Sequence, residues 1–472
     1  MFSVDEAGRQ LEELYATALE LVFMQSVGLP YDQAKIVKTA VALNNLCEKI
    51  LEQPTIPRLL RLSALNWLSR TIAYPYLLRF TQEYRNIAVP LLEVNGDSVN
   101  LLTWRNYRVQ TENWAEQRMV FDFFVEHAPK LIPTTKQHFS SYQEIHSRYN
   151  ETVLDTYLEH EQISYPDLVG FITKVGENAR KPFLQAAEHY CQKIKGESFA
   201  YWDDFIFLAH RTLKPLNAHF KELDPLAQVI KIFKHLGFPM EEIKVDSENR
   251  SNKAILPSCF SIRLPGDTRI AYRPSSKVGD LDGLLHEFGH GIHGLSSDPD
   301  DPFWKREHVP MSVLETFSFL FEGLLKDELF LTKQLKLEPV IAQDIVERLR
   351  ANNLYFRVFL AANSLMKLAF WKEGLSFDQA SQRWQELTRR FYIEVPGDYW
   401  LLYPINVQFT LYNPSYLMAY VRSVQLRHLL VDEFGETWWE EPRAGTYIAE
   451  LAATRAEFPI KEFPLDPDIL LK

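Results

Sequence analysis

The segment HEFGH at residues 286–290 has the residue types and spacing of a metal-dependent hydrolytic site. His286 and His290 are four positions apart, so on a helix both imidazoles project from one face and can bind one ion. Glu287 lies about 100° around such a helix from His286, beside the ion instead of on it. From there its carboxylate can take a proton from a zinc-activated water, whose pKa falls to about 7. The pattern therefore predicts zinc-dependent hydrolysis with Glu287 as the general base.

A catalytic zinc site also needs a third protein ligand and one open position. Glu315, which stands 25 residues after His290, is the leading candidate for that ligand. A competing interpretation is a capping box from Ser312 to Glu315, in which Glu315 closes the first helical turn. The intervening loop offers further candidate ligands: Asp300, Asp301 and His308.

Three more polar residues fall near the predicted ligands. His293 shares the helix face of His286, and we interpret it as a packing or supporting residue rather than a ligand. Asp282, four positions before His286, either orients that imidazole or is a solvated acid near the helix start. Glu322, seven positions after Glu315, either accepts a hydrogen bond from a ligand histidine or forms an ordinary salt bridge.

The elements that must position these residues can be predicted from local patterns. The runs SCFSIRL (258–264) and TRIAYRP (268–274) flank a Pro-Gly-Asp turn, which predicts a short β-hairpin. The run GDLDGLLHEFGHGIHGL (279–295) follows directly and predicts a helix that ends near Gly294. A second helix is expected over 312–330, and an extended peptide could add to the strand at 268–274.

The rest of the chain is mostly helical in pattern. From Val4 to about Cys191 apolar residues recur every three or four positions, with breaks at Gly28-Leu29-Pro30, around Asn95-Gly96-Asp97 and at Ile132-Pro133. A further helical stretch spans 201–235. The class is therefore mainly α with a small β-sheet beside the zinc helix. At 472 residues the chain is too long for one ordinary core. We expect an N-terminal helical lobe over 1–195 and a catalytic lobe over 196–472.

Composition narrows the classes of function. A net charge of -11 with no block of Lys and Arg argues against nucleic acid as a partner. No run of about eighteen apolar residues is present, so no membrane span is predicted. The three cysteines are far apart, and the first residues lack the pattern of a secretory signal, so we expect a reducing, cytoplasmic location. No feature of the sequence predicts an oligomeric state.

The segment HEFGHGIHGL, followed by Glu315 and then Glu322, resembles the thimet oligopeptidase and oligopeptidase F family. The resemblance implies that His286, His290 and Glu315 hold one Zn²⁺ per chain and that Glu287 is catalytic. It also implies two helical lobes around a deep substrate channel. The activity it implies is the cleavage of internal bonds in short peptides, as in an oligoendopeptidase.

A second part of the resemblance lies near the C-terminus. The run Tyr412-Asn413-Pro414-Ser415-Tyr416 is similar to a pair of tyrosines four positions apart in the same family. The resemblance implies that Tyr412 and Tyr416 assist at the oxyanion of the attacked carbonyl. Taken alone, the spacing of these two residues and Tyr420 is also that of a buried helix face.

Two alternative functions fit the same motif. A metallocarboxypeptidase of similar helical fold would need a cationic group for the free carboxylate, and Arg357, Arg422 and Arg427 are available. A non-catalytic protein that binds zinc or peptides is the other alternative. Glu287 argues against it, because a structural zinc site has no need of that carboxylate.

Overall fold

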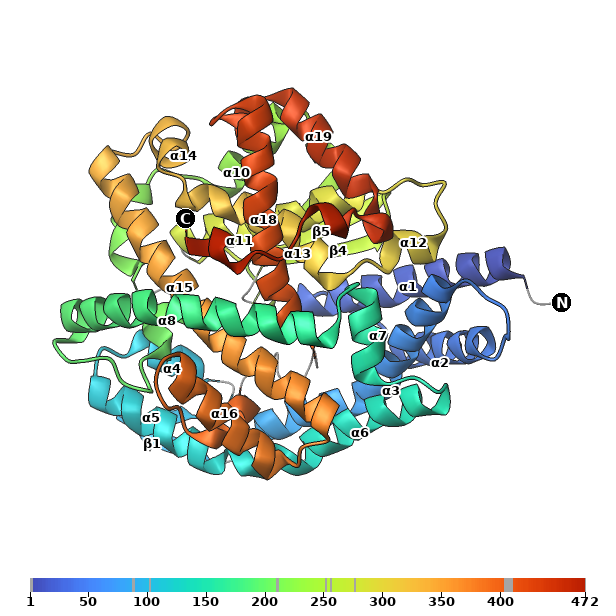
Figure 1. The fold of residues 1–472 in the computed structure, drawn as a ribbon, viewed down its shortest axis with the longest axis horizontal. Coiled ribbons are helices and arrows are strands. Elements are labelled where there is room, and N and C mark those ends of the chain that lie inside the picture. The colour runs from blue at the N-terminus through green and yellow to red at the C-terminus, as the bar shows by residue number, and fades with distance from the viewer. Residues whose placement is uncertain are drawn as a thin grey trace. The chain divides into compact units, whose positions relative to one another are not determined.

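The computed structural model describes most of the chain. The described residues are 3–86, 90–101, 103–208, 212–250, 253–254, 257–275, 277–402 and 411–471, with the backbone alone described at 73–86. Helices make up most of these residues and the strands form two small sheets (Figure 1), which confirms the predicted mainly α class. Among the described residues, no helix is both long enough and apolar enough to span a membrane. Cys47, Cys191 and Cys259 are free thiols.

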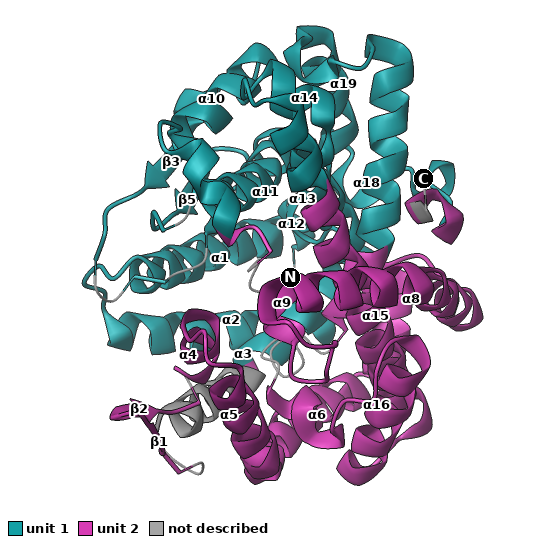
Figure 2. Ribbon diagram, turned by 90° about the vertical axis from the view of Figure 1, so that its left-hand side faces the viewer, with its two compact units in different colours: residues 1–71, 215–346, 418–465 teal, residues 72–214, 347–417, 466–472 magenta. Residues whose placement is uncertain are grey.

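The chain divides into two compact units (Figure 2). Unit 1 comprises residues 1–71, 215–346 and 418–465, and unit 2 comprises residues 72–214, 347–417 and 466–472. This division departs from the boundary expected between residues 195 and 196, because residues 1–71 belong with the segment that carries His286. The chain passes between the two units at five points, three of which lie inside α-helices: α3 (Arg58–Asn86), α15 (Pro339–Glu373) and α18 (Tyr412–Phe434).

Unit 1 contains the predicted metal ligands and a three-stranded sheet. Its other helices are α1 (Val4–Ser26), α2 (Gln33–Leu51), α10 (Pro225–His235), α11 (Lys277–Leu295), α12 (Phe303–Glu307), α13 (Met311–Glu322), α14 (Glu328–Lys333) and α19 (Pro442–Ala453). Its strands are β3 (Ile243–Asp246), β4 (Ser258–Arg263) and β5 (Asp267–Ala271).

The three strands lie in the order β3-β5-β4. Strands β4 and β5 form the predicted antiparallel hairpin, with Cys259 opposite Ile270. Strand β3, which the sequence analysis did not predict, pairs in parallel with β5. Both edges of β5 are therefore occupied, so an extended peptide cannot add to residues 268–274 as expected. The edge strand of the hairpin is β4.

Alternating side chains explain why the N-terminal helix belongs to unit 1. Phe260 and Ile262 of β4 point to one face of the sheet, where they pack with Phe23 of α1 and with Val27, which directly follows that helix. The rings of Phe23 and Phe260 meet edge to face at 5.4 Å between centroids. Helix α11 contacts β4 as well, near Ser261, whose side chain points to the other face. The sheet thus lies between α1 and α11.

Unit 2 is helical apart from one small hairpin. Its helices are α4 (Trp104–Gln110), α5 (Trp114–His127), α6 (Ile132–Arg148), α7 (Val153–His160), α8 (Tyr165–Lys195), α9 (Asp204–Leu208) and α16 (Phe377–Phe391). Strands β1 (Leu92–Val94) and β2 (Asp97–Val99) form the hairpin, where the sequence showed only a break. Asn95 and Gly96 both have positive φ angles, of 52° and 87°, which suits the two-residue turn of a hairpin.

Candidate metal centre

Helices α11 and α13 approach each other closely at Gly289. A Cβ atom at this position would lie 2.7 Å from the Cα atom of Ser318 and 2.8 Å from the carbonyl oxygen of Phe317. These distances are shorter than contacts that real Cβ atoms make, so the backbones approach only because residue 289 is glycine. This close approach brings Glu315 of α13 to the two histidines of α11.

The structure brings together the three predicted ligands. Nε2 of His286 lies 3.4 Å from Oε2 of Glu315, and Nε2 of His290 lies 3.7 Å from Oε1 of Glu315. One ligand atom from each of the three residues lies within 4.8 Å of those of the other two. Two ligands about 2.1 Å from a tetrahedral zinc ion are about 3.4 Å apart, so the donor set fits the ion.

The surroundings of Glu315 do not fit the capping-box interpretation. Helix α13 begins at Met311 with Pro310 at the N-cap, and no side chain caps it there. Glu315 is only 1% exposed and faces the imidazoles. The alternative ligands lie outside the group: Asp300 is exposed, Asp301 is paired with Lys305, and His308 is buried away from it.

Glu287 lies beside the ligand group at the edge of the sheet. Its carboxylate accepts a hydrogen bond from the backbone N–H of Cys259 in β4. Burial raises the pKa of Glu287 to about 7, with a smaller opposing effect from His286. A carboxylate with this pKa can both accept and release a proton near neutral pH, which a general base and acid must do.

The two candidate histidine ligands have different surroundings. Burial would lower the pKa of His286, but its contacts with Glu315 and Glu322 raise that pKa well above the usual value. Nδ1 of His286 lies 3.1 Å from Oε2 of Glu322. Burial lowers the pKa of His290 to about 4, so this imidazole is neutral at pH 7 and keeps a lone pair for a metal.

Glu322 makes both of the interactions considered for it. Besides His286, it contacts Lys326, whose Nζ lies 3.0 Å from Oε1 of Glu322. Asp282 is half-buried, and its Oδ1 is buried with no hydrogen-bond partner among the described residues. Burial and the nearby carboxylate of Glu322 raise the pKa of Asp282 to about 7.

His293 packs in the core and does not join the ligand group. Its side chain is fully buried, and its ring stacks on Phe317 at 4.5 Å between centroids. Neither ring nitrogen has a hydrogen-bond partner within the described part of the chain. The packing interpretation of His293 therefore matches the structure.

The predicted tyrosines lie at the start of α18, in unit 2. The rings of Tyr412 and Tyr416 are 4.5 Å apart between centroids, at an angle of 68°, and both are half-buried. The predicted ligands belong to unit 1, so the two tyrosines and the metal group are parts of different units. Tyr420 lies in unit 1, where its buried ring stacks on Phe319 at 4.1 Å.

The three arginines considered for a substrate carboxylate already have partners. Arg357 donates to the carbonyl oxygen of Leu470 at 2.6 Å. Arg427 donates to Oδ2 of Asp327 at 2.7 Å. The third, Arg422, is buried and donates to Oγ of Ser312.

Sequence reasoning missed two residues that touch this site. Cys259 contributes only its backbone N–H, for which no sequence signal exists. Lys326 carries a signal, since it stands four positions after Glu322 in a helical pattern. Such pairs are common on helices, and the sequence did not show that this one is next to His286.

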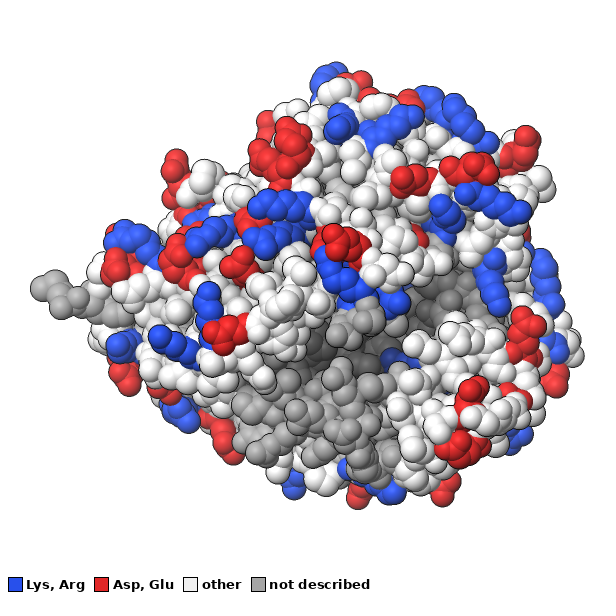
Figure 3. Space-filling model, turned by 180° about the vertical axis from the view of Figure 1, so that it is seen from behind, with Lys and Arg blue, Asp and Glu red and all other residues white. Residues whose placement is uncertain are grey.

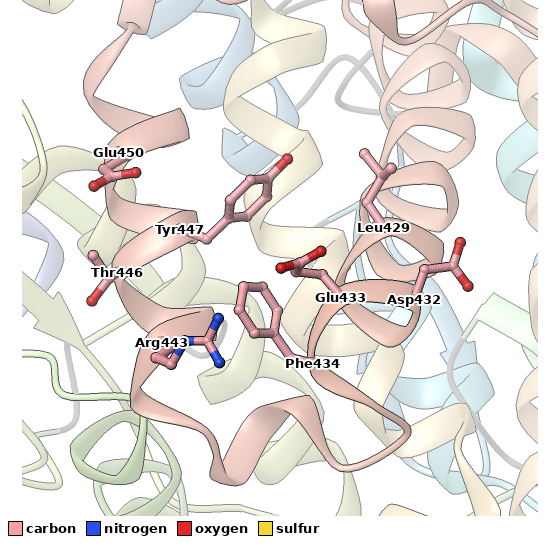
Figure 4. Close-up of a pocket in the computed structure, with 8 residues that line it drawn as sticks. All are labelled: Leu429, Asp432, Glu433, Phe434, Arg443, Thr446, Tyr447 and Glu450. Atoms are coloured by element: carbon pink, nitrogen blue, oxygen red, sulfur yellow. The ribbon is translucent and has the colours of Figure 1, made fainter.

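A hollow elsewhere in unit 1 contains none of the predicted site residues. It has a volume of about 520 Å³ and lies between the end of α18 and α19 (Figure 4). Its lining residues are Leu429, Asp432, Glu433, Phe434, Arg443, Thr446, Tyr447 and Glu450. On the face drawn in Figure 3, acidic and basic side chains are interspersed.

The chain is similar to solved structures over nearly its whole length. PZ peptidase A with an inhibitor matches at a TM-score of 0.64 and 13% identity, covering 98% of this chain and 92% of that one. Trypanosoma cruzi metallocarboxypeptidase 1 matches at a TM-score of 0.57 and 13% identity, covering 99% of this chain and 97% of that one. An M32 carboxypeptidase from Deinococcus radiodurans matches at a TM-score of 0.57 and 13% identity, covering 99% of this chain and 96% of that one.

These similarities establish the fold. No protein-family model and no curated protein sequence matches the chain. The resemblance to the thimet oligopeptidase and oligopeptidase F family therefore stays a prediction.

Proposed function

We propose that this protein is a zinc-dependent peptidase that binds one Zn²⁺ per chain through His286, His290 and Glu315. The observation that carries the proposal is the ligand group itself, with a carboxylate of raised pKa beside it. The solved peptidases of the same fold support this proposal. A structural zinc site would leave Glu287 without a use, because such sites are closed by four protein ligands.

The chemistry follows from the side chains. A bound zinc ion would activate a water molecule and polarise the carbonyl of the substrate. Glu287 takes a proton from the attacking water and later delivers it to the amine nitrogen of the leaving fragment. Tyr412 and Tyr416 are proposed to donate hydrogen bonds to the oxyanion, a role that rests on the family resemblance.

The edge of β4 is the proposed binding site for the backbone of the substrate. Strand β4 is an edge strand, and the backbone N–H of Cys259 donates to the Glu287 carboxylate. A peptide that adds to this edge makes hydrogen bonds that do not depend on its sequence. Its backbone would then run past Glu287, where the scissile bond must lie.

We place removal of C-terminal residues ahead of internal cleavage. Two of the solved structures described above are named carboxypeptidases, which favours this activity over the oligoendopeptidase activity expected from the sequence. The residue that would hold the free carboxylate of the substrate is unassigned, because Arg357, Arg422 and Arg427 have the partners described above. The restriction to short peptides and the channel between two lobes are proposed on the family resemblance alone.

One digestion separates the possibilities. Purified protein is incubated with a mixture of unstructured peptides, with and without a strong chelator, and the fragments are identified by mass. Stepwise loss of single C-terminal residues, abolished by the chelator and restored by Zn²⁺, supports the proposed carboxypeptidase. Internal cuts support an oligoendopeptidase, and intact peptides contradict the proposal of a peptidase.

A further inference from the structure

The carboxylate of Glu322 connects a proposed zinc ligand to a lysine. One oxygen lies 3.1 Å from Nδ1 of His286, and the other lies 3.0 Å from Nζ of Lys326. A histidine whose Nδ1–H donates to a carboxylate presents the lone pair of Nε2, and the ring is held in one orientation. The orientation of Glu322 therefore decides where Nε2 of His286 points.

Lys326 is the cation that acts on this buried carboxylate. Nζ of Lys326 lies 3.0 Å from Oε1 of Glu322, whose side chain is only 14% exposed. The Lys326 side chain is only 18% exposed, and its Nζ lies 5.7 Å from the centre of the Tyr420 ring. It follows that Lys326 is not an ordinary surface lysine.

A second carboxylate makes the role of the lysine more specific. Asp282 interacts electrostatically with Glu322, Lys326 and His286. Without Lys326, one oxygen of Glu322 would lose its partner, and the carboxylate of Glu322 would face that of Asp282, whose like charge repels it. Glu322 would then turn away from Asp282, which removes the fixed acceptor for Nδ1 of His286.

We propose that Lys326 is a positioning residue of the metal centre, which acts on His286 through Glu322. It holds one oxygen of Glu322, so that the other accepts the hydrogen bond of His286 and Nε2 faces Glu315. The inference rests on the proposed function in one respect, namely that His286 binds the metal. The structural alternative is a helix salt bridge that adds only to stability.

The test measures zinc affinity in the full-length protein. Lys326→Met, Lys326→Arg and the wild type are compared by competition of Zn²⁺ with a chromophoric chelator, and each metal-free protein is melted. Loss of a residue that supports a metal ligand costs about 10–100-fold in affinity. We expect this loss in Lys326→Met and restoration to within a few-fold in Lys326→Arg. The matched control is Lys333→Met, which breaks a surface pair with Glu440 and should leave zinc affinity unchanged.

A second comparison tests the route through Glu322. In a Glu322→Gln background the further change Lys326→Met should cause little additional loss, because the carboxylate that the lysine holds is already absent. Unchanged zinc affinity in Lys326→Met, or the full loss in both backgrounds, would overturn the proposal. If Lys326→Met does not fold, the uncharged Lys326→Gln replaces it and must show the same loss.

The test of Lys326 and the test of the proposed peptidase activity can fail independently. A wild type that binds zinc but cuts no peptide contradicts the peptidase, while the variants still decide the role of Lys326. A wild type that cuts peptides and a Lys326→Met variant of normal zinc affinity would contradict the inference alone.

Discussion

Two glutamates of the metal centre have the same side chain and different surroundings. Glu315 is buried against Nε2 of both His286 and His290, where a carboxylate can share an ion with them. Glu287 lies at the edge of β4 and accepts a hydrogen bond from a backbone N–H. Their proposed roles, ligand and general base, follow from these positions. Replacement by glutamine distinguishes the roles because it removes the charge and keeps the shape.

We predict opposite results for the two replacements. Glu287→Gln should bind Zn²⁺ as the wild type does and lose about 10²–10⁴-fold in turnover, the usual contribution of a general base. Glu315→Gln should lose zinc, because an amide is a poorer ligand than a carboxylate. Zinc content is measured by elemental analysis after dialysis, and turnover by peptide hydrolysis with zinc in excess.

The two variants also serve as controls for each other. Both keep the length and shape of the side chain, so a drop in melting temperature shared by both would indicate misfolding instead of a specific role. Normal turnover in Glu287→Gln would rule out the proposed proton route. Full zinc content in Glu315→Gln would place the third ligand elsewhere.

At the scale of elements, the site depends on how closely α11 and α13 approach. Helix α11 is rich in glycine, although each glycine in a helix costs about 1 kcal/mol relative to alanine. A Cβ at Gly291 would lie 3.0 Å from the Ile243 side chain, and one at Gly294 would lie 2.8 Å from that of Ser261. The glycines lower the helix propensity of α11, but they allow it to pack closely against the sheet and against α13.

Gly289 gives the sharpest prediction at this scale. In Gly289→Ala the new Cβ would meet backbone atoms of Phe317 and Ser318, so the two helices must shift apart. Overpacking of this kind costs about 1–3 kcal/mol, and the shift also carries Glu315 away from the histidines. We expect a lower free energy of unfolding and weaker zinc binding, measured by chemical denaturation and chelator competition.

Gly170→Ala is the matched control for this change. Gly170 is an exposed residue of α8, and a Cβ there meets no atom within 4 Å. That variant should be as stable as the wild type or gain up to about 1 kcal/mol, since alanine is the better helix former. Wild-type zinc affinity in Gly289→Ala would contradict the claim that close helix approach builds the site.

For the whole molecule, the open question is what unit 2 adds to the chemistry. The three proposed ligands and Glu287 all belong to unit 1, and unit 2 carries Tyr412 and Tyr416. The proposed chemistry at the metal needs far fewer residues than unit 2 contains. The family resemblance implies a substrate channel, and we keep the prediction that folded proteins are excluded from it on steric grounds.

This proposal predicts dependence on the size of the substrate. A short unstructured peptide should be hydrolysed, whereas the same sequence in a loop of a stable folded host should remain intact. Hydrolysis is followed by mass, and the host unfolded in advance is the control that restores access. Rapid hydrolysis of the folded host would contradict the restriction without affecting the metal assignment.

Local patterns determined much of this protein, because helix and hairpin formation depend on neighbouring residues. The spacing within HEFGH placed His286 and His290 on one helix face, and the Pro-Gly-Asp turn predicted the hairpin of β4 and β5. These are contacts within a few turns of one element, so the sequence by itself is sufficient.

Only the tertiary structure decided which distant residues meet. It paired β3 with β5, placed α1 on the sheet, and turned Glu315 to the histidines instead of to a helix cap. It also showed Lys326 beside Glu322 next to His286. Such contacts join segments that are far apart in the chain, and they depend on close packing at positions such as Gly289. That packing depends on many residues from distant segments together, so no single local pattern in the sequence reveals it.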